Sequence, residues 1–263
     1  MAPFTLLGRF LLELVQEIGG LGILIWRTTQ LLPRTFANAR AVFQQMDRIG
    51  IGSIPLVCVT SLFVGAVTAI QAAYQFHGYV PYKFIGTVVG KSVTLELGPV
   101  LTALVVGGRV SASIAAEIGT MKVTEQVDAL EMIAIDPVEY LVLPRVVAAT
   151  IMLPALTIFS DFLAIFGAAV VANISIGVSF HTFETGLKLL FRQQDLVGGL
   201  MKTFAFGYII ALMGCYHGFE TRGGAEGVGV ATMKAVVASC LLILISNYLL
   251  ASLIFRIIFA PSS

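Results

Sequence analysis

The sequence predicts an all-α integral membrane protein with about five transmembrane helices. Composition is the first reason, because the mean hydropathy is +0.94 and only 12% of the residues are charged, against about a quarter in a soluble domain. The second reason is that uncharged or nearly uncharged windows of about 20 residues, the length that crosses a bilayer, recur along the chain. The net charge of +1 supplies no basic field that would attract nucleic acid.

Five windows predict the membrane crossings. The first contains no charge between Arg48 and His77. The second retains Lys91, which can snorkel to the membrane surface, and Glu96, which must face a polar interior. Pro99 predicts a kink just after this glutamate. The predicted spans are 54–74, 84–106, a long helix beginning near residue 146, 196–216 and 235–255.

The segment before these spans is apolar, yet it is predicted to lie at the membrane surface. Residues 4–26 are interrupted by Arg9, Glu13 and Glu17, and further arginines follow, which fits an interfacial helix with a basic connector. A sixth crossing is the alternative. The segment lacks a compact apolar region followed by a small-residue cleavage site, so we expect it to be retained. The two parts expected in the chain are residues 1–48 and 49–263.

The distribution of Lys and Arg predicts the orientation. With a cytoplasmic N-terminus, ten of these residues lie inside and six outside, as the positive-inside rule favours. The polar segment after the second span and the Gly-rich loop after the fourth would then both face the cytoplasm. The six residues expected outside are Lys83, Lys91, Lys188, Arg192, Lys202 and Arg256.

A ladder of small residues predicts close helix packing. Small side chains recur every four positions at Gly107, Ser111, Ala115 and Gly119. Gly108 and Ala112 lie beside this row, so one helix face is nearly bare and a second helix can approach it closely. The partner helix could belong to the same chain or to a second copy, and the sequence leaves both open.

An acidic amphipathic helix is predicted over 124–136. Thr124 is a plausible N-cap, and Pro137 follows the end of the helix. The apolar stripe consists of Val127, Leu130 and Ala134, and the acidic residues off the stripe are Glu125, Asp128 and Glu131. A helix that lies on anionic lipid would be basic instead. We therefore favour docking into a cleft of a soluble subunit over an ordinary solvated loop helix.

The sequence carries no pattern for a metal, a cofactor or a nucleotide. Cys58, Cys215 and Cys240 lie in separate apolar runs and form neither a C-x-x-C motif nor a zinc-ligand pattern with the histidines, so core packing is expected. The glycines of 218–234 are not in the order G-x-G-x-x-G, and no G-K-[ST] follows. Any ATP hydrolysis would therefore belong to another chain.

Glu96 is the most informative single residue, because lipid does not tolerate an exposed carboxylate. It could pair with Lys91 or line a polar cavity, and we favour the cavity. Gln71, Tyr74 and Asp161 are other polar groups within predicted spans and must face protein or water. For Asp161, a simple hydrogen bond between helices is an equal alternative.

These segments together resemble the MlaE permeases, membrane subunits of ABC transporters for phospholipids. The resemblance rests on ELGPV at 96–100, GGRVSASIAAEIGTMKVTEQVDALEMIAIDP at 107–137 and GFETRGGAEGVGVAT at 218–232. It implies a homodimer in the bacterial inner membrane, a cytoplasmic ATPase dimer that holds ATP and Mg²⁺, and an MCE-domain protein on the outer side.

The resemblance also implies roles for individual residues. A cytoplasmic coupling helix would lie at about 117–136, and a lipid pocket between the two permeases would be lined or bordered by Gln71, Tyr74 and Glu96. The residues expected to contact the ATPase are Glu117, Met121, Lys122, Thr124, Glu125, Val127, Asp128, Leu130 and Glu131.

Two other classes of protein are alternatives. An ion- or proton-coupled secondary transporter could use Glu96 and Asp161 as coupling carboxylates, although no inverted repeat is evident. An intramembrane enzyme would need a nucleophile, a base and an orienting group, and no such set is recognisable. The expected chemistry is therefore binding and release of a lipid.

Overall fold

The computed structural model describes residues 3–36, 38–76, 80–190 and 192–258, and every regular element in these ranges is a helix. The α-helices are α1 (Pro3–Leu31), α2 (Ala39–Gly50), α3 (Ile54–Phe76), α4 (Ile85–Ser92), α5 (Gly98–Val123), α6 (Gln126–Met132), α7 (Leu143–Ile176), α8 (Phe180–Leu190), α9 (Gln193–Phe219) and α10 (Gly224–Ile258). Two π-helical segments, η4 (Val93–Leu97) and η5 (Val138–Val142), join neighbouring helices.

Within the described residues, five stretches are long and apolar enough to cross a membrane, which confirms the predicted fold class. They are longer than the windows in the sequence, because helices continue beyond the apolar part. The first stretch joins α2 to α3 and so runs across the boundary expected at residue 48. The stretches are Ala39–Phe76, Tyr82–Val123, Val138–Ile176, Gln193–Phe219 and Gly224–Arg256.

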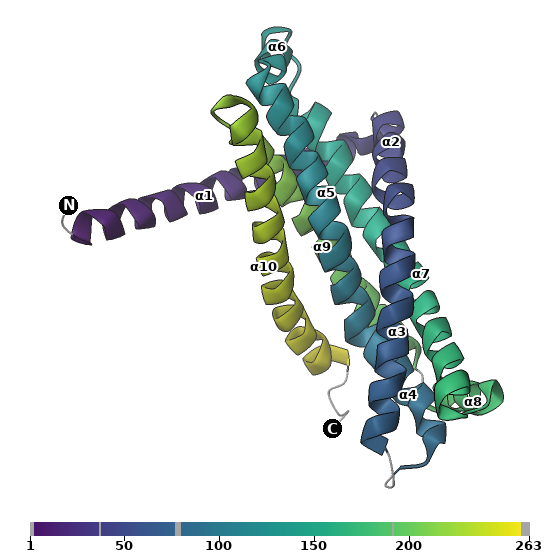
Figure 1. Ribbon diagram of the computed structural model, residues 1–263. Helices are drawn as coiled ribbons and strands as arrows, with labels where there is room; N and C mark the ends of the chain where they lie inside the picture. Colours follow the sequence, from purple (N-terminus) through teal and green to yellow (C-terminus); the bar gives the residue numbers. More distant parts are fainter. Residues whose placement is uncertain (1–2, 37, 77–79, 191, 259–263) are drawn as a thin grey trace.

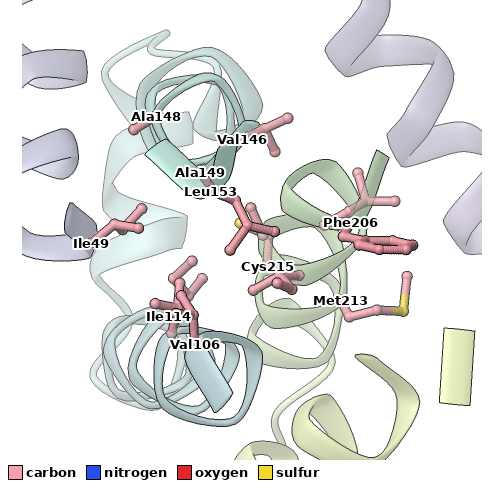
Figure 2. Close-up of a cluster of buried hydrophobic side chains, with 14 of the residues drawn as sticks. Ile49, Val106, Ile114, Val146, Ala148, Ala149, Leu153, Phe206, Met213 and Cys215 are labelled. Atoms are coloured by element: carbon pink, nitrogen blue, oxygen red, sulfur yellow. The ribbon is translucent and has the colours of Figure 1, made fainter. Parts of the chain in front are cut away.

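Helix α5 lies at the centre of the bundle, where it packs against α7, α9 and α10, while α3 packs along α7 (Figure 1). The main apolar core lies between α5, α7 and α9, with Ile114, Leu153 and Phe206 among its side chains (Figure 2). Cys215 is fully buried in this core, and Cys58 and Cys240 are half-buried. The expected packing role fits Cys215 best.

Glycine brings the backbones of neighbouring helices together. A Cβ on Gly65 of α3 would collide with the carbonyl oxygen of Ala164 in α7, and a Cβ on Gly207 of α9 would collide with the carbonyl oxygen of Ala149, also in α7. Without water between them, transmembrane helices associate through such close van der Waals contact. The small residues therefore set the distances of α7 from both neighbours.

The two ends of the bundle carry different short helices. At one end, α6 lies near the start of α10, and at the other α8 packs on α4 (Figure 1). We call these the α6 end and the α8 end. Helix α1 crosses the bundle at a steep angle near the α6 end (Figure 1) and is not among the five candidate spans. Its interfacial position remains a prediction, and the side chains of Arg9 and Glu13 lie outside the described residues.

The predicted interruption beside Pro99 takes the form of the π segment η4. Pro99 stands in the first turn of α5, where its missing N–H leaves one carbonyl of the preceding turn without its helical donor. The chain widens to π geometry over Val93–Leu97, directly before the proline. The irregular turn therefore contains Glu96, and π segments often mark functional positions.

Candidate functional site: a polar pocket beside the π segment

A pocket of about 350 Å³ lies between α3 and the α4–η4 segment. It brings Gln71 of α3 and Glu96 of η4 together, as expected for two residues of one site. Tyr74 is not among the lining residues, and its side chain is 83% exposed. The complete lining is Thr68, Gln71, Ala72, Gln75, Val88, Ser92, Glu96 and Leu97.

The carboxylate of Glu96 is neutralised by Lys202 of α9. Lys202 Nζ donates to Glu96 Oε1 at 2.6 Å, and Asn247 Nδ2 of α10 donates to Glu96 Oε2 at 3.1 Å. The lysine is only 2% exposed, whereas Glu96 remains 38% exposed toward the pocket. The pair therefore leaves one side of the carboxylate open to a ligand.

Lys202 was counted among the residues on the outer side of the membrane, and the structure buries its side chain within the helix bundle. The residue lies inside the bundle, because Glu96 and Asn247 satisfy its ammonium group there. Lys91, the alternative partner of Glu96, instead lies 3.8 Å from buried Asp195. One signal could have predicted this: Lys202 is the only charged residue within the predicted span 196–216, and intramembrane charges usually occur in pairs.

The pocket has the donors and acceptors of a polar headgroup site. Gln71, Gln75 and Ser92 provide amide and hydroxyl groups around the Glu96 carboxylate. Phe63 and Ile70 on α3 are exposed large apolar residues. Helix α3 thus contributes polar groups to the recess and carries exposed apolar side chains outside its lining, a combination that suits an amphipathic molecule.

The small-residue ladder divides into two rows. The buried row consists of Gly107, Ser111, Ala115 and Gly119. This row packs inside the chain against α9, where the carbonyl oxygen of Ser111 lies 3.0 Å from the position of a Cβ on Gly214. Beside it, Gly108 and Ala112 are half-exposed, and a Cβ on Gly108 would meet nothing within 4 Å. The second row is the part that remains available to another helix.

Helix α6 is shorter than the predicted helix 124–136. Thr124 ends α5 rather than starting α6, since its Oγ1 donates to the carbonyl of Thr120 at 2.8 Å. Glu125 precedes α6 in a left-handed conformation, with φ of 60°. This left-handed residue breaks the helical path between α5 and α6. The helix therefore begins at Gln126 and ends at Met132.

The predicted docking residues fall into different environments. Val127 is buried against its own chain, Met121, Lys122 and Leu130 are half-buried, and Lys122 forms an ion pair with Asp128 at 2.6 Å. Glu117 makes ion pairs with two arginines of the same chain. The exposed residues of the predicted set are Thr124, Glu125, Asp128 and Glu131. Next to them, Met132 and Ile133 are strongly exposed apolar side chains, and the sequence interpretation missed both.

Asp161 lies apart from the pocket. Its side chain is 4% exposed and packs against Gly98, and its Oδ1 has no hydrogen-bond partner among the described residues. The neighbouring Ser160 hydroxyl lies 2.8 Å from that of Ser61, which joins α7 to α3. The structure shows no hydrogen-bond partner for Asp161 Oδ1 among the described residues, and Asp161 does not line the pocket, so neither interpretation of this residue is confirmed.

The fold and the pocket define a multi-pass helical membrane protein with a polar site between two of its candidate membrane spans. The sequence profile of a family described as Permease MlaE matches residues 42–253. A probable ABC transporter permease protein of Rickettsia typhi is 40% identical over 253 residues, covering 96% of this chain and 98% of the relative. A probable ABC transporter permease protein of Synechocystis is 44% identical over 219 residues, covering 83% of each chain.

The chain belongs to the MlaE permease family, as its motifs predicted, and is a transport permease of the ABC transporter class. The similarity extends to plants. The Arabidopsis thaliana protein named trigalactosyldiacylglycerol 1, chloroplastic, is 36% identical over 217 residues, which cover 82% of this chain and 62% of that protein.

Proposed function

We propose that this chain is the membrane subunit of an ATP-driven phospholipid transporter. The observation that carries the proposal is the polar pocket at Glu96 and Gln71, between α3 and the α4–η4 segment; α3 also carries exposed large apolar residues outside the pocket lining. A phospholipid headgroup would bind the polar groups, and its acyl chains would lie along the apolar helix face. The lipid named in the Arabidopsis relative supports a lipid cargo.

The energy would come from a separate cytoplasmic ATPase dimer, which would hold ATP and Mg²⁺. The support is the ABC permease class of the relatives together with α6, whose exposed Met132 and Ile133 offer an apolar contact at one end of the bundle. The α6 end would then be cytoplasmic, as would the N-terminus. An MCE-domain protein would exchange lipid at the opposite, α8 end, across the bacterial inner membrane.

A second copy of the chain would complete the pocket. The pocket is open to the surface, and α3 carries exposed large apolar residues outside the pocket lining. The half-exposed row of Gly108 and Ala112 would allow a close approach of the partner. A homodimer would therefore enclose lipid between two permeases.

The test is reconstitution of the copurified complex in vesicles with a fluorescent phospholipid. We expect transfer that requires ATP and continues after an ionophore collapses the proton gradient. The variant Glu96→Gln should alter lipid transfer while ATP hydrolysis persists. Transport that stops with the gradient, although ATP is present, would instead support the secondary transporter. Purification without an ATPase or phospholipid would contradict the proposal.

A further inference from the structure

Glu117, expected to contact the ATPase, bridges two arginines of its own chain. Its Oε1 accepts a hydrogen bond from Arg48 Nη1 of α2 at 3.1 Å, and its Oε2 lies 2.8 Å from Arg145 Nη2 of α7. The side chain of Arg145 is 5% exposed, and its Nη1 also donates to the carbonyl oxygen of Leu141 at 2.6 Å. A buried guanidinium group needs such a carboxylate partner. Both oxygens of Glu117 are thus used inside the chain.

A fourth residue fastens the junction of α2 and α3 to α5. Arg109 Nη2 donates to the carbonyl oxygen of Arg48 at 2.7 Å, and Arg109 Nε donates to Ser53 Oγ at 3.3 Å. A Cβ on Gly52 would lie 2.6 Å from Arg109 Nη2, so the fit is close. We refer to Glu117, Arg48, Arg145 and Arg109 as the arginine clamp.

The clamp occupies the place where α6 joins the membrane bundle. The chain enters α6 from α5 and leaves it through η5 into α7, and Glu117 joins α5 to α7. A displacement of α6 therefore reaches the clamp through both of its connections. Because Arg48 and Arg109 hold the α2–α3 junction, the same displacement also reaches α3.

Two long helical stretches run from the clamp to the pocket. The chain from Arg48 follows α2 and α3 to Gln71, and α5 runs back from Glu117 to Glu96. At a rise of about 1.5 Å per residue, each path spans roughly 30–35 Å. Rigid secondary-structure elements can carry coupling over such distances, so the clamp can set how the two pocket walls move relative to each other.

We infer that Glu117 is a positioning residue, which couples movement of α6 to the α3 and η4 walls of the pocket through Arg145 and Arg48. The inference rests on the proposed ATP-driven function, because the ATPase supplies the movement. It differs from the docking role expected for Glu117. Docking would require its carboxylate to face the partner, whereas coupling requires the two internal ion pairs.

The test measures how far the pocket walls move in the copurified complex in nanodiscs. One spin label replaces the side chain of Gln75 on α3 and a second replaces that of Val88 on α4, both in the pocket lining. The labels are attached through introduced cysteines, and the three native cysteines are changed to alanine. The distance between the labels is then measured with ADP and with a non-hydrolysable ATP analogue.

Two clamp variants and one control are compared. Glu117→Gln removes the shared charge, and Arg48→Gln breaks only the ion pair of an arginine whose side chain is 66% exposed. Glu184→Gln, which breaks the exposed pair with Lys188 on α8, is the control. All three changes remove one charge, and Glu184→Gln matches Glu117→Gln in residue type and in the sign of the lost charge.

The unaltered complex and the control should show a nucleotide-dependent change of distance. In both clamp variants this change should shrink by at least about half, and lipid moved per ATP should fall about tenfold, while the ATPase stays bound. If Glu117→Gln does not fold, Arg48→Gln decides alone. An unchanged distance response in the clamp variants, no response in the unaltered complex, or loss of the ATPase from Glu117→Gln would overturn the inference. A distance response in the labelled complex, without lipid transfer by the unlabelled complex, would refute the proposed cargo and leave the coupling role standing.

Discussion

Lys202 Nζ lies 2.6 Å from Glu96 Oε1, and this ion pair joins α9 to the π segment η4 across 106 residues of sequence. The two partners have different surroundings, because the lysine is enclosed by protein whereas the carboxylate borders an open pocket. Removing Glu96 and removing Lys202 should therefore destabilise the protein by different amounts.

Glu96→Leu should destabilise the protein more than Lys202→Met. The first variant leaves a buried ammonium group without its counter-charge, which costs about 3–5 kcal/mol, whereas the second leaves a carboxylate that water in the pocket can reach. The double variant should lose less than the sum of the two. Thermal unfolding of the four proteins in one detergent gives this comparison, and equal losses from the two single variants would contradict the asymmetry.

Gly65→Ala should destabilise the packing of α3 on α7. Its new Cβ would collide with the carbonyl oxygen of Ala164, and overpacking of this kind costs about 1–3 kcal/mol. Gly19→Ala is a matched control, because nothing lies within 4 Å of a Cβ there. The midpoint of thermal unfolding should fall for the first variant alone. A similar midpoint for both would show that α3 moves away without cost.

Gly108→Leu should preserve the fold of a single chain and weaken association of two copies. The position is half-exposed and has free space around it in one chain, but a large side chain would separate closely packed helices. Cross-linking of cysteine pairs placed along α5 would report contact between copies. Unchanged linking between copies in this variant would place the interface elsewhere.

Met132→Glu should reduce retention of the ATPase without affecting the stability of the membrane domain. The side chain is 84% exposed at the end of α6, so a charge there meets water in the isolated chain and an apolar cleft in the proposed complex. Leu130→Glu should act in the same direction, although Leu130 is half-buried. Met132→Leu serves as the conservative control, and copurification measures the outcome. Full ATPase binding by Met132→Glu would refute docking at this helix.

Asp161→Asn should leave lipid transport intact. The side chain is buried against Gly98, outside the pocket lining, and an amide has nearly the same shape as a carboxyl group. A coupling carboxylate of a proton-driven transporter could not tolerate this change. Transport by the variant in vesicles therefore distinguishes the two classes, and its complete loss would favour proton coupling.

The helical membrane fold could be predicted because each helix that crosses a lipid bilayer needs a continuous run of about 20 mostly apolar residues, which is visible in the sequence. Apolar windows located all five spans, and Pro99 marked the interruption beside Glu96. The ends of the helices were less predictable. The 54–74 window missed α2, since a helix continues past the membrane wherever its backbone hydrogen bonds can be made.

The candidate site was predictable only in part. Glu96 and Gln71 are candidates because they are polar groups in apolar spans, and the structure places both in one pocket. Tyr74 has the same signal but lies outside that lining, because a one-residue change of position on a helix rotates the side chain by about 100°. The polarity of a residue does not show toward which side of the helix it points, because that direction depends on how the helix packs against its neighbours.

The sequence by itself determined that the protein is a membrane protein, that it is helical and which family it belongs to, since these follow from composition and from local motifs. Only the tertiary structure decided which charges meet. Glu96 pairs with Lys202 and not with Lys91, which is five positions away in the sequence. Glu117 pairs with two arginines of its own chain, although the sequence also allowed contact with a partner protein. Such pairings depend on the rotation and depth of helices that are distant in sequence, and close packing at glycines such as Gly65 and Gly207 fixes both.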